Sequence, residues 1–221
     1  MKKYMLAFQE VTTPITDAVT KLGGQPVWLS TPQWPLSRET GQAMCFIAQV
    51  ALYPDIFGAV PAQMAYLFLT DDPDIDTYDP ASGENAVILQ PGTFTGPVVE
   101  QASGPSLYRE FYDPQANEFR RVPCEFRVIL EPGADPDLDL SRGVDMSEWG
   151  DAMEPLRGDK IGGVPGFVQA PEYPDDGVWR LLLQIEEPLG LNPLFKLNFG
   201  GGVGYTFMST DGTRAGFLWQ R

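Results

Sequence analysis

The chain has 221 residues and a formal net charge of −15, and it contains no histidine. A chain of this length buries roughly 70–75% of the surface that its unfolded form exposes, so it can build a core without disulfides or a structural metal. The absence of histidine excludes an imidazole general base, histidine-containing catalytic triads and histidine-rich metal sites. The negative charge also disfavours direct binding to nucleic acid.

The two cysteines, Cys45 and Cys124, each lie in an apolar, strand-like run. We expect two free, buried thiols, which indicates a reducing compartment. At the N-terminus, MKKYMLAFQEV has an apolar stretch shorter than the roughly 7–15 residues of a signal peptide. No run approaches the roughly 18 apolar residues that a membrane span needs. The sequence thus predicts a soluble, cytoplasmic protein.

The first predicted elements are a short helix and a glycine turn. Thr13-Pro14 is typical of a helix start, and we expect this helix to end at Gly23. The segment KLGGQPVWL at 21–29 follows. Its pair Gly23 and Gly24 allows positive φ or a close backbone approach, and Pro26 fixes an extended exit. We therefore expect a turn after which the chain continues as an extended segment across the protein.

The next segment, MCFIAQVAL at 44–52, is too apolar for a strand with one wet face. We expect a strand covered on both faces that carries one buried polar side chain, Gln49. A buried glutamine needs hydrogen-bond partners, and we expect backbone groups of the glycine turn to supply them. Another strand begins at Tyr66 with YLFLTDD.

The segment 71–159 carries nearly all of the net charge. It has twenty acidic and six basic side chains, whereas residues 1–70 are neutral and residues 160–221 sum to −1. Its densest parts are DDPDIDTYD at 71–79 and ADPDLDLSRGVD at 134–145. The charge is therefore a property of one part of the chain.

Four hypotheses compete for these aspartates. DPDID at 72–76 spaces carboxylates like the start of a calcium loop, but Thr77 stands where such a loop needs glycine. A carboxylate pair for glycoside hydrolysis needs one acid in a dry pocket, whereas aspartates spaced two apart among prolines are typical of solvated chain. The third hypothesis is a charged loop that only keeps the protein soluble. The fourth is an acidic docking surface for a basic partner.

Further strands are predicted at 86–90, 107–112 and 124–131. In CEFRVILE at 124–131 one set of alternating positions is apolar and the other is mostly charged, which is typical of a strand with one wet face. DMSEWGDAM from Asp145 predicts a short helix, because its first residue can cap the helix and Glu148 stands three residues later.

A second copy of the early motifs begins at residue 160. KIGGVPGFVQ at 160–169 repeats the glycine pair and the proline, WRLLLQIEE at 179–187 repeats the strand with one glutamine, and YTFMSTDG repeats the aromatic strand. In each copy 43 residues separate the first glycine of the pair from the tyrosine of the aromatic strand. Four matched features at one spacing indicate an internal duplication.

The last segments complete the prediction of the fold. FGGGVGY at 199–205 does not match GxGxxG and precedes an aromatic strand, so we expect a turn or bulge instead of a dinucleotide site. AGFLWQ at 215–220 predicts a final strand. We predict a mainly β (α+β) fold with few short helices, in which two related halves form one domain over 1–221. The repeats span about 21–72 and 160–211, and the acidic segment 71–159 lies between them.

The paired motifs resemble those of a known bacterial family. KLGGQPVWL followed by TPQWP, then YLFLTDD, KIGGVPGFVQ, LLLQIEE, FGGGVGYTF and FLWQ together resemble the YwqG-like family, a domain of unknown function. The resemblance covers essentially the whole chain, although the segment 71–159 is unusually long and acidic. It implies a mainly β fold with internal duplication and no established catalytic residues. It also implies, for some members, a genomic setting among polymorphic toxins.

These observations favour a binding protein over an enzyme. An acidic face on a rigid β scaffold attracts a basic partner, and nucleases need basic clefts to bind the nucleic acid backbone. We therefore expect an immunity protein that occludes a basic toxin, with a nuclease as the favoured activity, and we expect no catalytic residues, cofactor or metal. The alternative is a small-molecule-binding or enzymatic domain whose pocket lies between the two repeats near the glycine turns.

The candidate residues fall into two sets. The expected partner-binding residues are Asp71, Asp72, Asp74, Asp76, Asp79, Asp135, Asp137, Asp139, Asp145, Glu148 and Trp149. The expected structural residues of the repeat are Gly23, Gly24, Pro26, Gln49, Gly162, Gly163, Pro165 and Gln184. Among the five tryptophans, Trp149 is the one that we expect at an interface, because the others lie mostly in core-like motifs.

Overall fold

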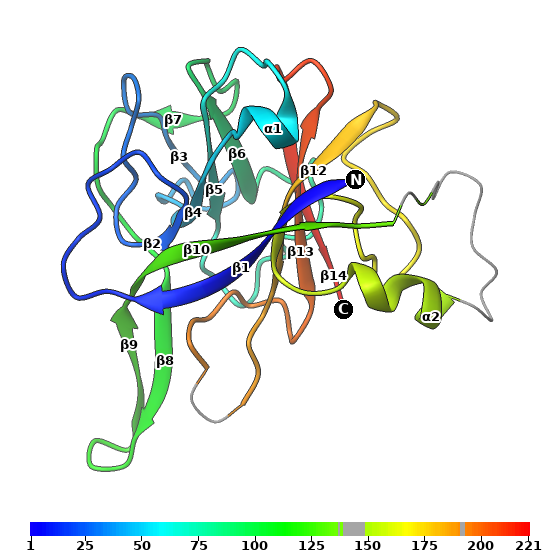
Figure 1. Ribbon diagram of the computed structural model, residues 1–221. Coiled ribbons are helices and arrows are strands. Elements are labelled where there is room, and N and C mark those ends of the chain that lie inside the picture. Colours follow the sequence, from blue (N-terminus) through cyan, green and yellow to red (C-terminus); the bar gives the residue numbers. More distant parts are fainter. Residues whose placement is uncertain (137, 139–148, 191–192) are drawn as a thin grey trace.

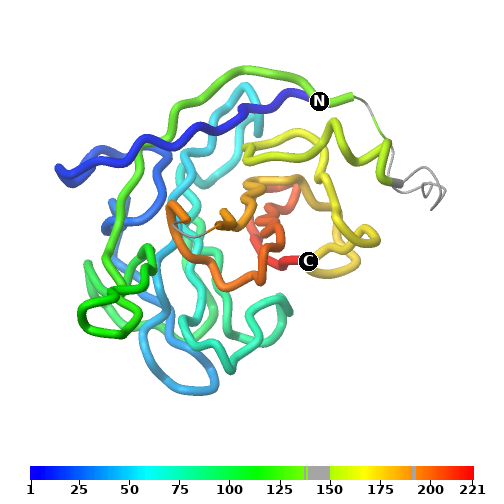
Figure 2. The backbone as a smooth tube through the Cα atoms, turned by 90° about the horizontal axis from the view of Figure 1, so that it is seen from below, coloured from blue at the N-terminus to red at the C-terminus, as the bar shows by residue number. Residues whose placement is uncertain are grey.

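The structure, a computed structural model, describes residues 1–221 except 137, 139–148 and 191–192. It is mainly β, as the sequence predicts. Ten strands form one antiparallel sheet, in the spatial order β14 (Ala215–Gln220), β13 (Val203–Ser209), β12 (Trp179–Glu186), β11 (Lys160–Gly162), β1 (Lys2–Glu10), β10 (Glu125–Ala134), β2 (Lys21–Gly23), β4 (Cys45–Ala51), β5 (Met64–Leu69) and β6 (Asn85–Gln90). The sheet curls until its edge strands β14 and β6 come into contact, which makes a nearly closed barrel (Figure 1 and Figure 2).

The strand order shows how the duplication builds the barrel. The first half supplies β2, β4, β5 and β6, and the second half supplies β11, β12, β13 and β14 in mirrored order. At the centre, β1 and β10 pair with each other, from Lys2 opposite Ala134 to Glu10 opposite Phe126. These two strands are exchanged between the halves, because β1 pairs with β11 and β10 pairs with β2. The duplication thus extends beyond the two ranges expected from the sequence.

The smaller elements lie outside this sheet. β3 (Trp34–Pro35) pairs with β7 (Val98–Val99), and β8 (Tyr108–Asp113) pairs with β9 (Glu118–Pro123) in a hairpin that projects from the barrel (Figure 1). The helices are α1 (Pro54–Phe57), α2 (Trp149–Met153) and the 3₁₀ turn η2 (Glu154–Leu156).

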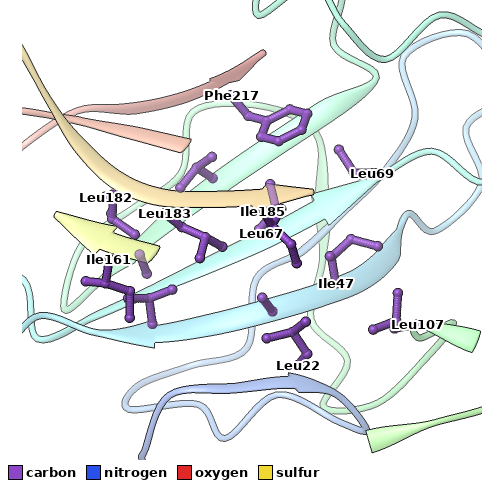
Figure 3. Close-up of a cluster of buried hydrophobic side chains, with 14 of the residues drawn as sticks. Leu22, Ile47, Leu67, Leu69, Leu107, Ile161, Leu182, Leu183, Ile185 and Phe217 are labelled. Carbon is purple, nitrogen blue, oxygen red and sulfur yellow. The ribbon is translucent and has the colours of Figure 1, made fainter. Parts of the chain in front are cut away.

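The main core fills the interior of the barrel. It joins residues of both halves, among them Leu22, Ile47, Leu67, Ile161, Leu183 and Phe217 (Figure 3). Two further clusters cover the sheet on its other face. One gathers around Trp34 and Tyr66 in the first half, and the other around Phe167 and Tyr205 in the second. Strands β4 and β12 are therefore covered on both faces, as their apolar sequences predict.

The helix predicted from Thr13-Pro14 to Gly23 is wrong. Residues 11–20 form no helix, and β2 begins at Lys21. The reason is tertiary: the Ile15 amide donates to a Glu125 carboxylate oxygen (3.1 Å), and the Ile15 carbonyl accepts from Lys21 Nζ (3.0 Å). Glu125 is distant in the sequence, and Lys21, which lies within the predicted segment, binds the Ile15 carbonyl that a helix would pair with the amide of residue 19.

Other local predictions are confirmed. The strands expected at 86–90, 107–112, 124–131 and 215–220 are β6, β8, β10 and β14. Of the helix expected from Asp145, the part over Trp149–Met153 is present as α2, and its expected cap Asp145 and Glu148 lie outside the described residues. FGGGVGY forms a turn with positive φ at Gly200 and Gly201. Cys45 and Cys124 are free and buried.

Candidate functional site

The two glycine turns have the same geometry. Gly23 and Gly24 both have φ 65°, and Gly162 and Gly163 have φ 71° and 77°. A Cβ added to Gly24 would lie 2.3 Å from the carboxyl carbon of Glu125, and one added to Gly163 would lie 2.2 Å from Asp135 Oδ2. Each turn thus needs glycine both for its left-handed backbone and for the carboxylate packed against it.

Each carboxylate pairs with the buried lysine that precedes the turn. Lys21 Nζ lies 2.6 Å from Glu125 Oε1, and Lys160 Nζ lies 2.8 Å from Asp135 Oδ2. Glu125 begins β10 and Asp135 follows its last residue, so one strand positions the acids of both halves. Burial raises the pKa of the Asp135 carboxyl, but hydrogen bonds from Lys160, Lys3 and the Val164 amide outweigh it and lower that pKa. Sequence reasoning missed the lysines, although the K of KLGG and KIGG recurs in both copies.

Both repeated glutamines bind backbone groups through the two ends of their side-chain amides. Gln49 accepts from the Val27 amide (2.8 Å) and donates to the Val19 carbonyl (2.7 Å). Gln184 accepts from the Gly166 amide (2.9 Å) and donates to the Gly158 carbonyl (2.9 Å).

Two more side chains of each half hold the same loop. Tyr66 donates to the Val27 carbonyl and Tyr205 to the Gly166 carbonyl, at 2.8 and 2.9 Å. Gln90 and Gln220 end the last strand of each half and bind the following residues of that loop. The shared Q at the ends of AVILQ and AGFLWQ was the sequence signal for this last pair.

Two of the predicted docking residues have structural roles instead. The structure corrects the placement of Asp135, which is 4% exposed and ion-paired with Lys160 and Lys3. Asp71 is half-buried and accepts from Tyr108 Oη at 2.7 Å and from Arg121 at 2.8 Å. These carboxylates are occupied within the protein, which leaves them unsuited to contact a partner.

The remaining aspartates of the β5–β6 loop face solvent. Asp74, Asp76 and Asp79 are exposed, and Asp72 is half-buried. Within the part of the chain that the structure describes, none of the four forms an ion pair with lysine or arginine. This loop is therefore a source of uncompensated negative charge.

The remaining predicted partner-binding residues lie in or next to the part of the chain that the structure does not describe. Asp137, Asp139, Asp145 and Glu148 lie outside the described residues. Trp149 is the first residue of α2, and its side chain is not among those described.

The β8–β9 hairpin lies beside the acidic loop and exposes aromatic side chains. Tyr112 and Phe119 are cross-strand partners with ring centroids 5.4 Å apart, and they are 49% and 68% exposed. Asp71 joins this hairpin to the start of the acidic loop through Tyr108 and Arg121. These bonds are at the base of the hairpin, whereas Tyr112 and Phe119 lie toward its tip. We name the acidic loop and the hairpin tip together the docking face, which consists of Asp72, Asp74, Asp76, Asp79, Tyr112 and Phe119.

A cavity of about 320 Å³ lies beside the second glycine turn. Both halves line it: Ile56 and Phe57 of α1 face Gly162, Gly163 and residues 179–181 of β12. Its charged lining side chains in the described chain are Lys2 and Arg180, with no carboxylate. A pocket between the repeats is thus present, but without the acids that hydrolysis by a carboxylate pair requires.

A pair of carboxylates, Asp159 and Glu186, lines another cavity, of about 380 Å³. Burial raises the pKa of Asp159 to about 6. Each acid is engaged by backbone: Asp159 accepts from the Glu186 amide (2.7 Å), and Glu186 accepts from the Gly158 amide (2.8 Å). Among the described residues, no three acidic or cysteine side chains are placed to bind one metal ion.

Comparison with protein-family models identifies the family of the chain. The model of a domain of unknown function, DUF1963, matches residues 20–215. The chain belongs to the DUF1963 family. The match begins just before the first glycine turn and ends at the start of β14, so the DUF1963 domain includes both halves of the duplication. A search of curated proteins finds no match to this DUF1963 chain. Among its described residues, no helix is long and apolar enough to cross a membrane.

Proposed function

We propose that this DUF1963 protein is an immunity protein that binds a basic protein toxin, with a nuclease as the favoured target. We also propose that it belongs to the YwqG-like group, whose motifs its paired glycine turns resemble. In this account the protein is not an enzyme and uses no cofactor, and it resides in the bacterial cytoplasm, where a toxin would act.

The observation that carries the proposal is the unpaired charge of the β5–β6 loop. Asp74, Asp76 and Asp79 are exposed and Asp72 is half-exposed, with no ion-pair partner among the described residues. Such a cluster attracts a basic partner over a distance of about 10 Å at moderate salt and raises the rate of encounter. By the same charge it repels nucleic acid, which a nuclease binds in its basic cleft.

The exposed hairpin supplies aromatic side chains that can contribute binding affinity, which charge alone does not. Large aromatic side chains contribute most of the affinity at many interfaces, and rim charges mainly change the association rate. Phe119 and Tyr112 stand on a hairpin whose two strands pair with each other and with no other strand of the described chain. An isolated two-stranded hairpin is marginally stable in water, so a partner that covers this one would also order it. The docking face thus combines steering by charge with anchoring by aromatic rings.

The proposal is tested with a basic nuclease toxin encoded beside the gene. We expect equimolar protein to abolish its nuclease activity, and Phe119→Ala to weaken inhibition about tenfold or more through faster dissociation. The matched control is Val178→Ala, since Val178 is 72% exposed and lies outside the docking face. Full activity of the nuclease at saturating wild-type protein would reject the function. Equal inhibition by all three proteins would reject the hairpin as the anchor.

A further inference from the structure

In the first half of the barrel, the edge of β4 is occupied by an extended segment of the same chain. The Phe46 amide donates to the Pro105 carbonyl (2.9 Å), and the Leu107 amide donates to the Phe46 carbonyl (2.8 Å). Ser106 thereby forms a parallel bridge with Phe46. Leu107 is fully buried, and its carbonyl accepts from the Cys124 amide (3.0 Å). Residues 104–107 thus extend the sheet by a short strand beyond the end of β2.

The second half has the same edge without that segment. The counterpart of Phe46 is Leu181, because β12 pairs with β13 in the register of β4 with β5 and carries its bulge at the same place, between Leu181 and Leu183. β11 pairs with β12 only as far as Leu183. No described segment of the chain pairs with β12 beyond this point on that side. The cavity of about 320 Å³ lies here, lined by Leu181.

The walls of the cavity correspond to the groups that surround residues 104–107. In the first half, Gln25 exchanges two hydrogen bonds with Gly104 (2.8 and 3.1 Å), and the ring of Trp34 packs against Gly104. By the spacing of the repeat, Gln25 corresponds to Val164 and Trp34 to Tyr173. Both Val164 and Tyr173 line the cavity. The cavity is therefore the counterpart of an occupied peptide site.

The two halves differ in charge at this site. Cys45 and Cys124 flank Leu107 in the first half, where the three apolar side chains pack in one core. The repeat places Arg180 at the position of Cys45, and Lys2 at that of Cys124, because Lys3 pairs with Gly162 as Glu125 pairs with Gly23. Both cations line the cavity, and no described acidic side chain does. Ile56 of α1 lies beside Gly162, where Leu107 lies beside Gly23 in the first half, and Arg180 also donates to the Phe57 carbonyl (2.8 Å). An occupant with a carboxylate in the remaining cavity would compensate the charges of Arg180 and Lys2.

We propose that this cavity binds an extended, acidic peptide segment of a second polypeptide, as a short strand parallel to β12. Its backbone pairs with the Leu181 amide and carbonyl, as residues 105 and 107 pair with Phe46. Its carboxylate lies between Arg180 and Lys2. Main-chain pairing gives affinity, and the cations select the acidic side chain. This site lies beside α1 and the N-terminus, away from the β8–β9 hairpin (Figure 1).

The test uses synthetic peptides derived from residues 102–107. The probe is fluorescein-labelled ASGPSE, in which glutamate replaces the last residue of ASGPSL, and the controls end in glutamine or lysine. We expect the glutamate peptide to bind at micromolar to submillimolar concentration, and at least tenfold more tightly than either control. Lys2→Gln should weaken its binding severalfold, because Lys2 is exposed and its loss leaves the core intact.

A second measurement tests the backbone pairing. Methylation of the last amide nitrogen of the peptide removes the hydrogen that the Leu181 carbonyl would accept, and we expect binding to fall at least tenfold. In amide NMR spectra, the unmodified peptide should shift the signals of Leu181 and Gly163. Absence of binding by the glutamate peptide at about 5 mM would overturn the proposal, and so would a methylated or lysine peptide that binds as tightly as the unmodified glutamate peptide. Substitutions of the docking face should not change these results, so this inference and the immunity function can fail separately.

Discussion

At the scale of single residues, two buried lysines organise the fold. Lys21 and Lys160 are 1% and 0% exposed, and each neutralises one acid from an end of β10. Removal of one member of a buried ion pair leaves the other charge without compensation, which costs about 3–5 kcal/mol. The cost is this large because Asp135 is buried and the side chain of Glu125 is only 11% exposed, so water solvates neither carboxylate fully.

We therefore predict that Lys160→Met and Lys21→Met each lower the free energy of unfolding by about 3 kcal/mol in urea titrations. The control is Lys2→Met, since Lys2 is exposed and should change stability by no more than about 0.5 kcal/mol. If Lys160→Met were as stable as Lys2→Met, the ion pair with Asp135 would have no structural role.

A second residue-scale prediction concerns pH. Burial raises the pKa of Asp159 to about 6, above its value in the unfolded chain, so the folded state is penalised when this acid is ionised. The contribution of Asp159 to the free energy of unfolding is largest below about pH 4 and is lost as the pH rises through about 6. Asp159→Asn should therefore be about 1–2 kcal/mol more stable than wild type at pH 7.5, with the difference falling to about 0.2 kcal/mol at pH 3.5.

Urea titrations at the two pH values measure this difference. Asp159→Thr is an informative second variant, because Thr20 holds the same position in the first half and accepts from the Ala51 amide (3.0 Å). A gain in stability that does not depend on pH would contradict the assignment to Asp159.

The acidic residues show how far single positions can be predicted from sequence. Asp71 and Asp74 lie in one run of aspartates, yet the first accepts hydrogen bonds from Tyr108 and Arg121 and the second is exposed. Their partners are 37 or more residues away along the chain, so no local pattern distinguishes the two. The buried glutamines were predictable because each interrupts an otherwise apolar strand.

At the scale of elements, the glycine turns are the repeated unit. Gly163→Ala meets two obstacles, the left-handed backbone and a Cβ position 2.2 Å from Asp135 Oδ2. Gly41→Ala meets only the first, because a Cβ there has no neighbour within 4 Å and φ is 68°. We expect losses of about 3 kcal/mol or more for Gly163→Ala and about 1 kcal/mol for Gly41→Ala in thermal or urea unfolding. Equal losses would show that contact with the carboxylate is unimportant.

Strands were easier to predict than their pairing. The apolar runs of β4 and β12 predict cover on both faces, and the alternation in β10 predicts one wet face, because these patterns are local. The exchange of β1 and β10 between the halves joins strands that are more than a hundred residues apart, such as β1 and β10 at Leu6 and Leu130. Nothing in either strand alone specifies this partner. The prediction of a short helix at 13–23 was wrong for the same reason, because Ile15 binds Glu125, which is distant in the sequence.

At the scale of the whole molecule, the exchanged strands join the two halves into one sheet. β10 completes the first half and β1 the second, so neither half keeps its neighbours if the chain is divided. We predict a single cooperative unfolding transition, with near- and far-ultraviolet circular dichroism giving the same midpoint. Fragments 1–123 and 124–221 should each be unfolded alone. A fragment that folds by itself would contradict the shared core.

The docking face is also a property of the whole molecule, because Asp71 connects the start of the acidic loop to the base of the aromatic hairpin. The most direct test is the association rate with the basic toxin at several salt concentrations. The variant replaces Asp72, Asp74, Asp76 and Asp79 by asparagine, and the control makes the same charge change at the exposed residues Asp17, Glu100, Glu172 and Asp176.

We predict that the docking-face variant associates at least tenfold more slowly at low salt and loses most of its salt dependence, while the control stays within about threefold of wild type. Steering by local charge requires this difference, since both variants have the same net charge. Equal rates for the two variants at every salt concentration would contradict the claim that this face binds the toxin.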